Sequence, residues 1–171
     1  MKKILVSIIL YFFLSVNTFG HLQHYAKVNY LEYDLFRNND LIGSHKYNFE
    51  RVGDNLTINS TVNFKISKFG VDLYKYFAES TEKYEKNNFK SFNSTTMQNK
   101  KNKYVNISLN LDKTKLKIDG SSYRGDADLN YLVGTWWNHE IVKAKAQISA
   151  ISGRIIEQKV IFLGKKQIEL N

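Results

Sequence analysis

His45 is the side chain in this 171-residue chain that most resembles a catalytic group. An imidazole can act as a general base when a carboxylate orients it and its pKa lies near neutral pH. Glu82 could supply that carboxylate across a sheet. The alternative, which we favour, is a structural histidine that is hydrogen-bonded within a strand or turn.

The other ionisable residues form no catalytic or metal-binding motif. Asp126 and Asp128 could act as paired carboxylates, but an isolated D-x-D in a loop more often caps a turn. No G-x-S-x-G stretch marks a nucleophilic serine. We therefore expect no catalytic residue, no metal and no cofactor. Metal-binding H-x-H or HExxH spacing is also missing among the four histidines, which are His21, His24, His45 and His139.

The two tryptophans, Trp136 and Trp137, are neighbours in a stretch without strand periodicity. In a loop beside the open side of a sheet, they could form the lid of a ligand site. A plug in a filled hydrophobic core is the equal alternative.

The elements that would position these residues are strands, as Leu56–Ile66 shows best. Its even-numbered positions are apolar except for Ser60, and none of its odd-numbered positions is apolar. A period of two is typical of a strand with one buried and one exposed face. Turns rich in Gly, Asn and Asp separate it from similar stretches. The expected strands are 27–37, 41–51, 56–66, 71–85, 89–97, 105–111 and a short one at 116–118.

The strand pattern breaks between residues 121 and 151, where 128–145 could hold one or two helical turns. Strand character returns at 154–163 and begins again at 167–170. Consecutive strands without intervening helices predict an all-β protein. We expect a single curved antiparallel sheet that forms a barrel or half-barrel, with the irregular or short helical segment at about 121–151 over its open side.

The N-terminus reads as a cleaved signal peptide over residues 1–20, which leaves one domain at 21–171. Lys2 and Lys3 precede an apolar run of 11 residues, Ile4–Leu14. That run is shorter than the about 20 residues of an ordinary membrane span. An uncleaved anchor is the alternative. Because the chain has no Cys, it suits a bacterial periplasm better than an animal extracellular space. We predict a periplasmic or secreted protein cleaved near Gly20.

The net charge of +9 limits the kinds of partner that this protein could bind. Positive side chains are scattered, with one denser run at Lys100, Lys101 and Lys103. A nucleic-acid site would need a basic face interleaved with stacking aromatic rings, so we expect no nucleic acid partner. A solvated lysine-rich surface is the simplest interpretation, and attraction to an anionic membrane surface is the alternative.

Four short motifs follow one another along the chain: Ile42-Gly43-Ser44-His45, Tyr74-Lys75-Tyr76 with Glu82 after it, Trp137-Asn138, and Gln147 to Arg154. Together they resemble an uncharacterised exported bacterial family, a domain of unknown function with a lipocalin-like or half-barrel fold. The resemblance covers residues 30–170. Members usually continue into further strands, so the domain could lack its final strands.

The resemblance implies an exported β protein with a lipid-handling cavity, and it implies no reaction. Glu82 and Arg154 fall at matching family positions, where we expect a structural ion pair because a partly buried charge needs a partner. The candidate ligand-binding residues are His45, Tyr74, Tyr76, Glu82, Trp136, Trp137 and Asn138.

Three functional hypotheses follow. The first is a binding module that holds an apolar, lipid-like ligand in the concavity of the sheet. The second is an envelope structural or interaction protein with a filled core and no ligand, whose partner would be an envelope protein or an anionic membrane surface. The third, and least favoured, is an enzyme that uses His45 and Glu82.

Overall fold

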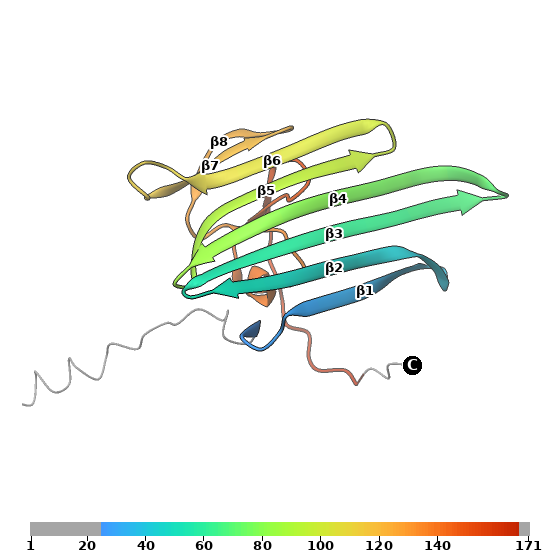
Figure 1. The fold of residues 1–171 in the computed structure, drawn as a ribbon, viewed down its shortest axis with the longest axis horizontal. Helices are drawn as coiled ribbons and strands as arrows, with labels where there is room; N and C mark the ends of the chain where they lie inside the picture. The colour runs from blue at the N-terminus through green and yellow to red at the C-terminus, as the bar shows by residue number, and fades with distance from the viewer. Residues whose placement is uncertain (1–24, 168–171) are drawn as a thin grey trace, which may run out of the picture.

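The computed structural model describes residues 25–167, so the predicted signal peptide lies outside the described part of the chain. The main element is an eight-stranded antiparallel sheet in which each strand pairs with its neighbours in sequence (Figure 1). Its strands are β1 (Tyr30–Arg37), β2 (Asp40–Val52), β3 (Asn55–Lys68), β4 (Val71–Glu85), β5 (Asn88–Gln98), β6 (Lys101–Leu109), β7 (Lys115–Gly120) and β8 (Arg124–Asp128).

The prediction of an all-β protein with one curved antiparallel sheet is confirmed. The sheet takes the half-barrel form and is not closed, because β1 and β8 are its two edges. The first seven strands lie where the alternation predicts them, and β4 has the predicted bounds of Val71–Glu85.

The segment expected to be irregular, 121–151, contains more strand than predicted. Besides β8, it holds β9 (Leu132–Val133) and β10 (Ala146–Ile148). The expected helical turn is the 3-10 helix η2 (His139–Lys143). With β11 (Ile155–Glu157), β9 and β10 form a second sheet of three strands.

The strand predicted over 154–163 is wrong in extent, since only β11 pairs there, with β10. The residues after β11 remain largely exposed. A strand needs a partner for its backbone groups as well as an apolar sequence. The strand start predicted at 167–170 falls almost entirely outside the described residues.

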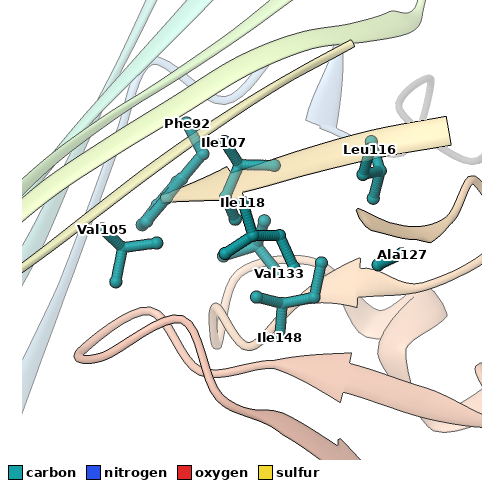
Figure 2. Packing of buried hydrophobic residues seen from close by; sticks show 8 residues of the cluster. All are labelled: Phe92, Val105, Ile107, Leu116, Ile118, Ala127, Val133 and Ile148. Atoms are coloured by element: carbon teal, nitrogen blue, oxygen red, sulfur yellow. The ribbon is translucent and has the colours of Figure 1, made fainter. Parts of the chain in front are cut away.

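The hydrophobic core lies between one face of the large sheet and the small sheet (Figure 2). Val133 and Ile148 from the small sheet pack in one buried cluster with side chains of β5, β6 and β7. Ile107 in this cluster is 1% exposed. The alternation predicted from the sequence therefore separates a buried face from an exposed one. The eight members of the cluster are Phe92, Val105, Ile107, Leu116, Ile118, Ala127, Val133 and Ile148.

Residues 129–157, which hold the small sheet and η2, cover the buried face of the large sheet, and we call them the cover. Two glycines allow the cover to approach the large sheet closely. A Cβ atom on Gly120 of β7 would lie 2.6 Å from the backbone oxygen of Ser152. Gly153 has a φ of +78° and its own Cβ would lie 3.0 Å from Ile118. These close approaches hold the turn after β10 against β7. They therefore set how closely the cover packs on the large sheet.

The opposite face of the large sheet is polar. Thr81 donates a hydrogen bond to Asn59 at 2.9 Å, and Asn93 donates one to Asn106 at 2.8 Å. Such cross-strand pairs suit a face in contact with water. Within residues 25–167, no helix is long and apolar enough to cross a membrane.

Truncation of a buried side chain should therefore cost far more than truncation of its exposed neighbour. We expect Ile107→Ala to lower the free energy of unfolding by about 3 kcal/mol, because it removes apolar contacts and leaves a cavity. Ser108→Ala, on the exposed face, should change it by less than about 0.5 kcal/mol. Urea denaturation of both variants measures the difference, and equal losses would contradict the assignment of the two faces.

Candidate functional site

The covered face of the large sheet changes from bulky to small side chains along the central strands. Ser60 of β3 pairs with Ser80 of β4, and Ser80 pairs with Ser94 of β5. The next inward-facing positions of β4 and β5 are Ala78 and Thr96, which also pair. Small side chains in adjacent strands leave space beneath the cover.

This space is a partly open cavity of about 380 Å³. It falls in the range of about 300–1,000 Å³ that is typical of small-molecule sites. Aromatic residues of β2, β3 and β4 form its walls, and residues 134–136 and 150–151 form its roof. The aromatic and imidazole side chains that line it are His45, Tyr47, Phe64, Tyr74, Tyr76 and Trp136.

His45 lies on β2, where its side chain is 8% exposed. Its Nε2 is 2.8 Å from the Ser60 hydroxyl, and its Nδ1 is 3.5 Å from the Tyr47 hydroxyl. Burial lowers the pKa of His45 to about 4, because a charged imidazole would lose its hydration. The ring is therefore neutral at neutral pH and can both donate and accept a hydrogen bond.

Tyr47 and Trp136 connect the sheet to the roof of the cavity. The Trp136 backbone N–H donates to the Tyr47 hydroxyl at 3.2 Å. The Trp136 side chain is 72% exposed, with its ring centroid 5.8 Å from that of His45. Burial raises the pKa of Tyr47, so its hydroxyl stays protonated. Trp136 thus stands at the rim of the cavity, as a lid residue would.

Two hydroxyl groups of the cavity lining have no hydrogen-bond partner. Among the described residues, the buried side-chain polar atoms without one are the hydroxyl oxygens of Thr96 and Thr135. The two residues are 3% and 8% exposed, and both line the cavity. Burial raises the pKa of the neighbouring Tyr76, and its interaction with the Thr96 side chain opposes part of that rise, but the two hydroxyls do not have the geometry of a hydrogen bond. Buried polar groups are normally paired, so these two are open to a ligand or to water.

Glu82 forms a separate buried cluster. Its two carboxylate oxygens accept hydrogen bonds from the Tyr84 hydroxyl at 2.5 Å and from the Trp137 indole N–H at 2.9 Å. Burial raises the pKa of Glu82 to about 7, and the two hydrogen bonds oppose the rise. The pKa of Tyr84 is also raised. Burial is the main cause, and the charge of the adjacent Glu82 is the next.

Trp137 is the core plug that was one of the two expectations for the tryptophan pair. It is 1% exposed and makes edge-to-face contacts with Tyr25, Phe49 and Tyr84 at centroid distances of 5.4, 5.7 and 6.1 Å. The two adjacent tryptophans therefore play different parts, since Trp136 remains at the rim.

The structure does not bring together either of the two predicted pairs of Glu82. His45 bonds to Ser60, whereas Glu82 bonds to Tyr84 and Trp137. The predicted ion pair with Arg154 is wrong, because Arg154 is exposed while Glu82 is buried and satisfied by neutral donors. A fully buried carboxylate can be stabilised by directed hydrogen bonds from neutral groups.

Six of the seven candidate residues line two hollows, and the seventh, Trp137, is buried in the core. His45, Tyr74, Tyr76 and Trp136 line the cavity. Asn138 lies with Glu82 on the wall of a second, more open hollow of about 720 Å³, and it caps η2 by accepting from the Glu140 backbone N–H.

The second hollow is a poorer candidate site. Two of the lysines on its rim are already paired, Lys90 with Glu85 and Lys143 with Glu140. Both unpartnered hydroxyls lie in the smaller cavity. We therefore take the smaller cavity as the candidate site.

The residues that sequence reasoning missed are the small and hydroxyl-bearing ones: Ser60, Ser80, Ala78, Thr96 and Thr135. One signal for them was available. Ser60 is the exception in the otherwise apolar face of Leu56–Ile66. Its alignment with Ser80 and Ser94 depends on strand register, which the sequence pattern did not provide.

The chemistry of the cavity suits binding. The 2.8 Å contact between His45 and Ser60 has the spacing of a base and a nucleophile. However, the second nitrogen of His45 faces a tyrosine hydroxyl, and a depressed pKa makes the imidazole a weak base. The described residues also contain no cluster of His, Cys, Asp or Glu that could hold a metal ion.

The opposite pKa shifts of His45 and Glu82 predict a measurable pH effect. Between about pH 4.5 and 7, folded Glu82 holds a proton that the unfolded chain releases, so its contribution to stability falls as pH rises. Between about pH 4 and 6.5, the unfolded chain protonates His45 more readily than the folded one, so that contribution falls as pH drops.

The two effects oppose each other in the wild type, and single variants should separate them. From pH 6.5 to 4.5, Glu82→Gln should lose about 2 kcal/mol of stability relative to the wild type, and His45→Asn should gain about as much. Urea denaturation at the two pH values gives both differences, in which the other titrating groups cancel. If the free energy of unfolding changed equally between the two pH values in all three proteins, the pKa shifts of Glu82 and His45 would be contradicted.

Comparisons with known proteins place this chain within a family. Neither the comparison with curated proteins nor that with solved structures found a match. A family model described as "Domain of unknown function (DUF6134)" matches residues 33–171. This range begins within β1 and spans the rest of the large sheet and the whole small sheet. The chain therefore belongs to the family of the domain of unknown function DUF6134.

Proposed function

We propose that this protein is a binding module that holds an apolar, lipid-like ligand in the cavity between the large sheet and its cover. The observation that carries the proposal is the pair of buried, unpartnered hydroxyls of Thr96 and Thr135 in an otherwise largely aromatic and aliphatic lining. An apolar cavity with a few convergent polar groups is the usual form of a small-molecule site.

The lining also indicates the polar end of the ligand. Among the described residues that line the cavity, the charged one is Glu79, and it is exposed. His45 is neutral there, and no Lys or Arg belongs to the lining. An anionic head group would be desolvated without a counter-charge, which is costly. The favoured ligand therefore has an uncharged hydroxyl or carbonyl head and an apolar tail.

Trp136 should report on such a ligand. Titration with monooleoylglycerol should shift the tryptophan emission to shorter wavelength and saturate, because the ligand would displace water around the exposed indole. Oleate, which has the same tail but a charged head at neutral pH, should bind at least about tenfold more weakly. Native mass spectrometry of freshly purified protein should show a bound neutral lipid.

Two variants provide the control. Ser80→Leu fills the floor of the cavity and should abolish the titration, whereas Thr95→Leu, on the exposed face of the adjacent strand, should leave it unchanged. Trp136→Phe should remove the emission change, because Trp137 is buried away from the ligand. An unchanged spectrum with every neutral lipid, together with an empty protein by mass spectrometry, would favour the envelope-interaction alternative.

We further propose that the protein is exported and acts in the periplasm or outside the cell. The support is the basic and apolar pattern of residues 1–20 and the absence of Cys from the chain. Cell fractionation followed by N-terminal sequencing should find a protein that begins close to His21 in the periplasmic or secreted fraction. Recovery of the intact chain from the cytoplasm would contradict export.

A further inference from the structure

Three hairpins of the large sheet end on the same side of the molecule. They are the turns between β1 and β2, between β3 and β4, and between β5 and β6, and the second of these projects farthest (Figure 1). The cover does not extend over this end, and inward-facing residues such as Phe64, Ile66 and Tyr74 are only partly buried there.

The tip of the β3–β4 hairpin has an unusual residue. Phe69 has a φ of +52° and is followed by Gly70 with a φ of +77°. Two consecutive residues with positive φ form the tight hairpin turn that favours Asn-Gly, and a bulky side chain is strained in that conformation. The corresponding turn between β1 and β2 uses Asn38 and Asn39.

The Phe69 side chain is not buried, so no hydrophobic contact with the core offsets this backbone strain. Its side chain is 94% exposed, and its nearest described ring contact is with the Lys68 ammonium, 5.4 Å from the ring centroid. An exposed phenylalanine at a position that favours asparagine does not stabilise the fold. A strained residue at a tip points to a role outside the folded chain.

The surroundings of Phe69 combine exposed apolar side chains with positive charge. Of the two aspartates at this end, Asp72 is already paired with Lys65 and Lys75, and Asp40 lies opposite Arg37 in the turn between β1 and β2. Lys68, Lys100 and Lys101 are exposed at this end. The exposed apolar residues at this end are Phe36, Leu41, Phe69, Val71, Leu73 and Met97.

We propose that this end of the sheet docks on an anionic lipid bilayer, with Phe69 inserted into the interface. Phe and Leu side chains flanked by lysines can insert at the boundary between the lipid head groups and the acyl chains, and the lysines are attracted to an anionic surface. A protein partner of unknown sequence would not require this combination of a strained apolar tip and flanking lysines.

The position of the cavity fits this orientation. Leu35, Phe64 and Tyr74 line the cavity and lie on the strands that lead to the docking hairpins. A bound bilayer would therefore lie near the end of the molecule from which an apolar ligand could enter. The docking proposal does not rest on the ligand proposal, since a bilayer can bind this end while the cavity stays empty.

The absence of Cys permits a local test. Phe69→Cys labelled with the fluorophore NBD should show a blue shift and a severalfold rise in emission on vesicles of phosphatidylglycerol and phosphatidylethanolamine. Pure phosphatidylcholine vesicles should give little change. Leu111→Cys, a fully exposed site on a turn at the other end of the sheet, is the matched control and should stay silent. A local probe separates insertion of the tip from any effect of residues 4–14.

A second variant separates docking from folding. Phe69→Asn should weaken vesicle binding about tenfold, because it removes an aromatic side chain from the interface. It should keep or raise the melting temperature, because asparagine suits the positive φ. A silent Phe69 probe, equal changes at both probes, or Phe69→Asn binding like the wild type would each overturn the proposal. Binding of neutral lipid in the cavity is measured by the Trp136 titration. Failure of the docking proposal would therefore leave the ligand proposal intact.

Discussion

The hydrogen bond from Trp137 to Glu82 joins the cover to the large sheet through two buried side chains. A single sheet has two faces, and one of them must be covered if its apolar side chains are to leave water. The cover here has little regular structure, so side-chain contacts must hold it. A buried carboxylate without donors would be costly, and Trp137 and Tyr84 supply the donors.

The same contact determines where the molecule is filled and where it is hollow. Trp137 enters the aromatic cluster that includes Phe49 and Tyr84. Because Trp136 is the preceding residue, its side chain is held at the rim above His45. Beneath it, Ser60, Ser80 and Ser94 are too small to fill the space. The cavity therefore results from the sizes of side chains on three adjacent strands and from the position of one anchored residue.

The length of the strands accounts for the remaining features. Strand β4 has 15 residues, and the cover extends over only part of this length. Side chains beyond the cover lose the protection that the core provides, and this explains the exposed aromatic and aliphatic residues near the hairpin tips. A surface of this kind on a protein with many lysines suits an interface with anionic lipid. Along the strands of the large sheet, the filled aromatic cluster around Trp137, the cavity and the exposed hairpin tips thus follow one another.

The fold class follows from the sequence because alternation is a local property. In Leu56–Ile66 every second side chain is apolar, and successive side chains of a strand point to opposite faces. The same reasoning located the neighbouring strands and their turns. It was less successful after Ser121, where the strands are only two to five residues long, too short to show alternation, and where β9 pairs in parallel with β10 across the intervening 3-10 helix.

The composition of the site was decided only by the tertiary structure. The motif residues His45, Tyr74 and Tyr76 were identified from the sequence, and they do line one cavity. Their true partners were not identified, because Ser60 meets His45 through strand register and Trp137 meets Glu82 across 55 residues of chain. The sequence determined which residues face inward along each strand. Whether Glu82 would pair with Arg154 or with an indole, and which tryptophan would be buried, depended on how the cover folds back onto the sheet, since that packing brings together residues that no local pattern relates.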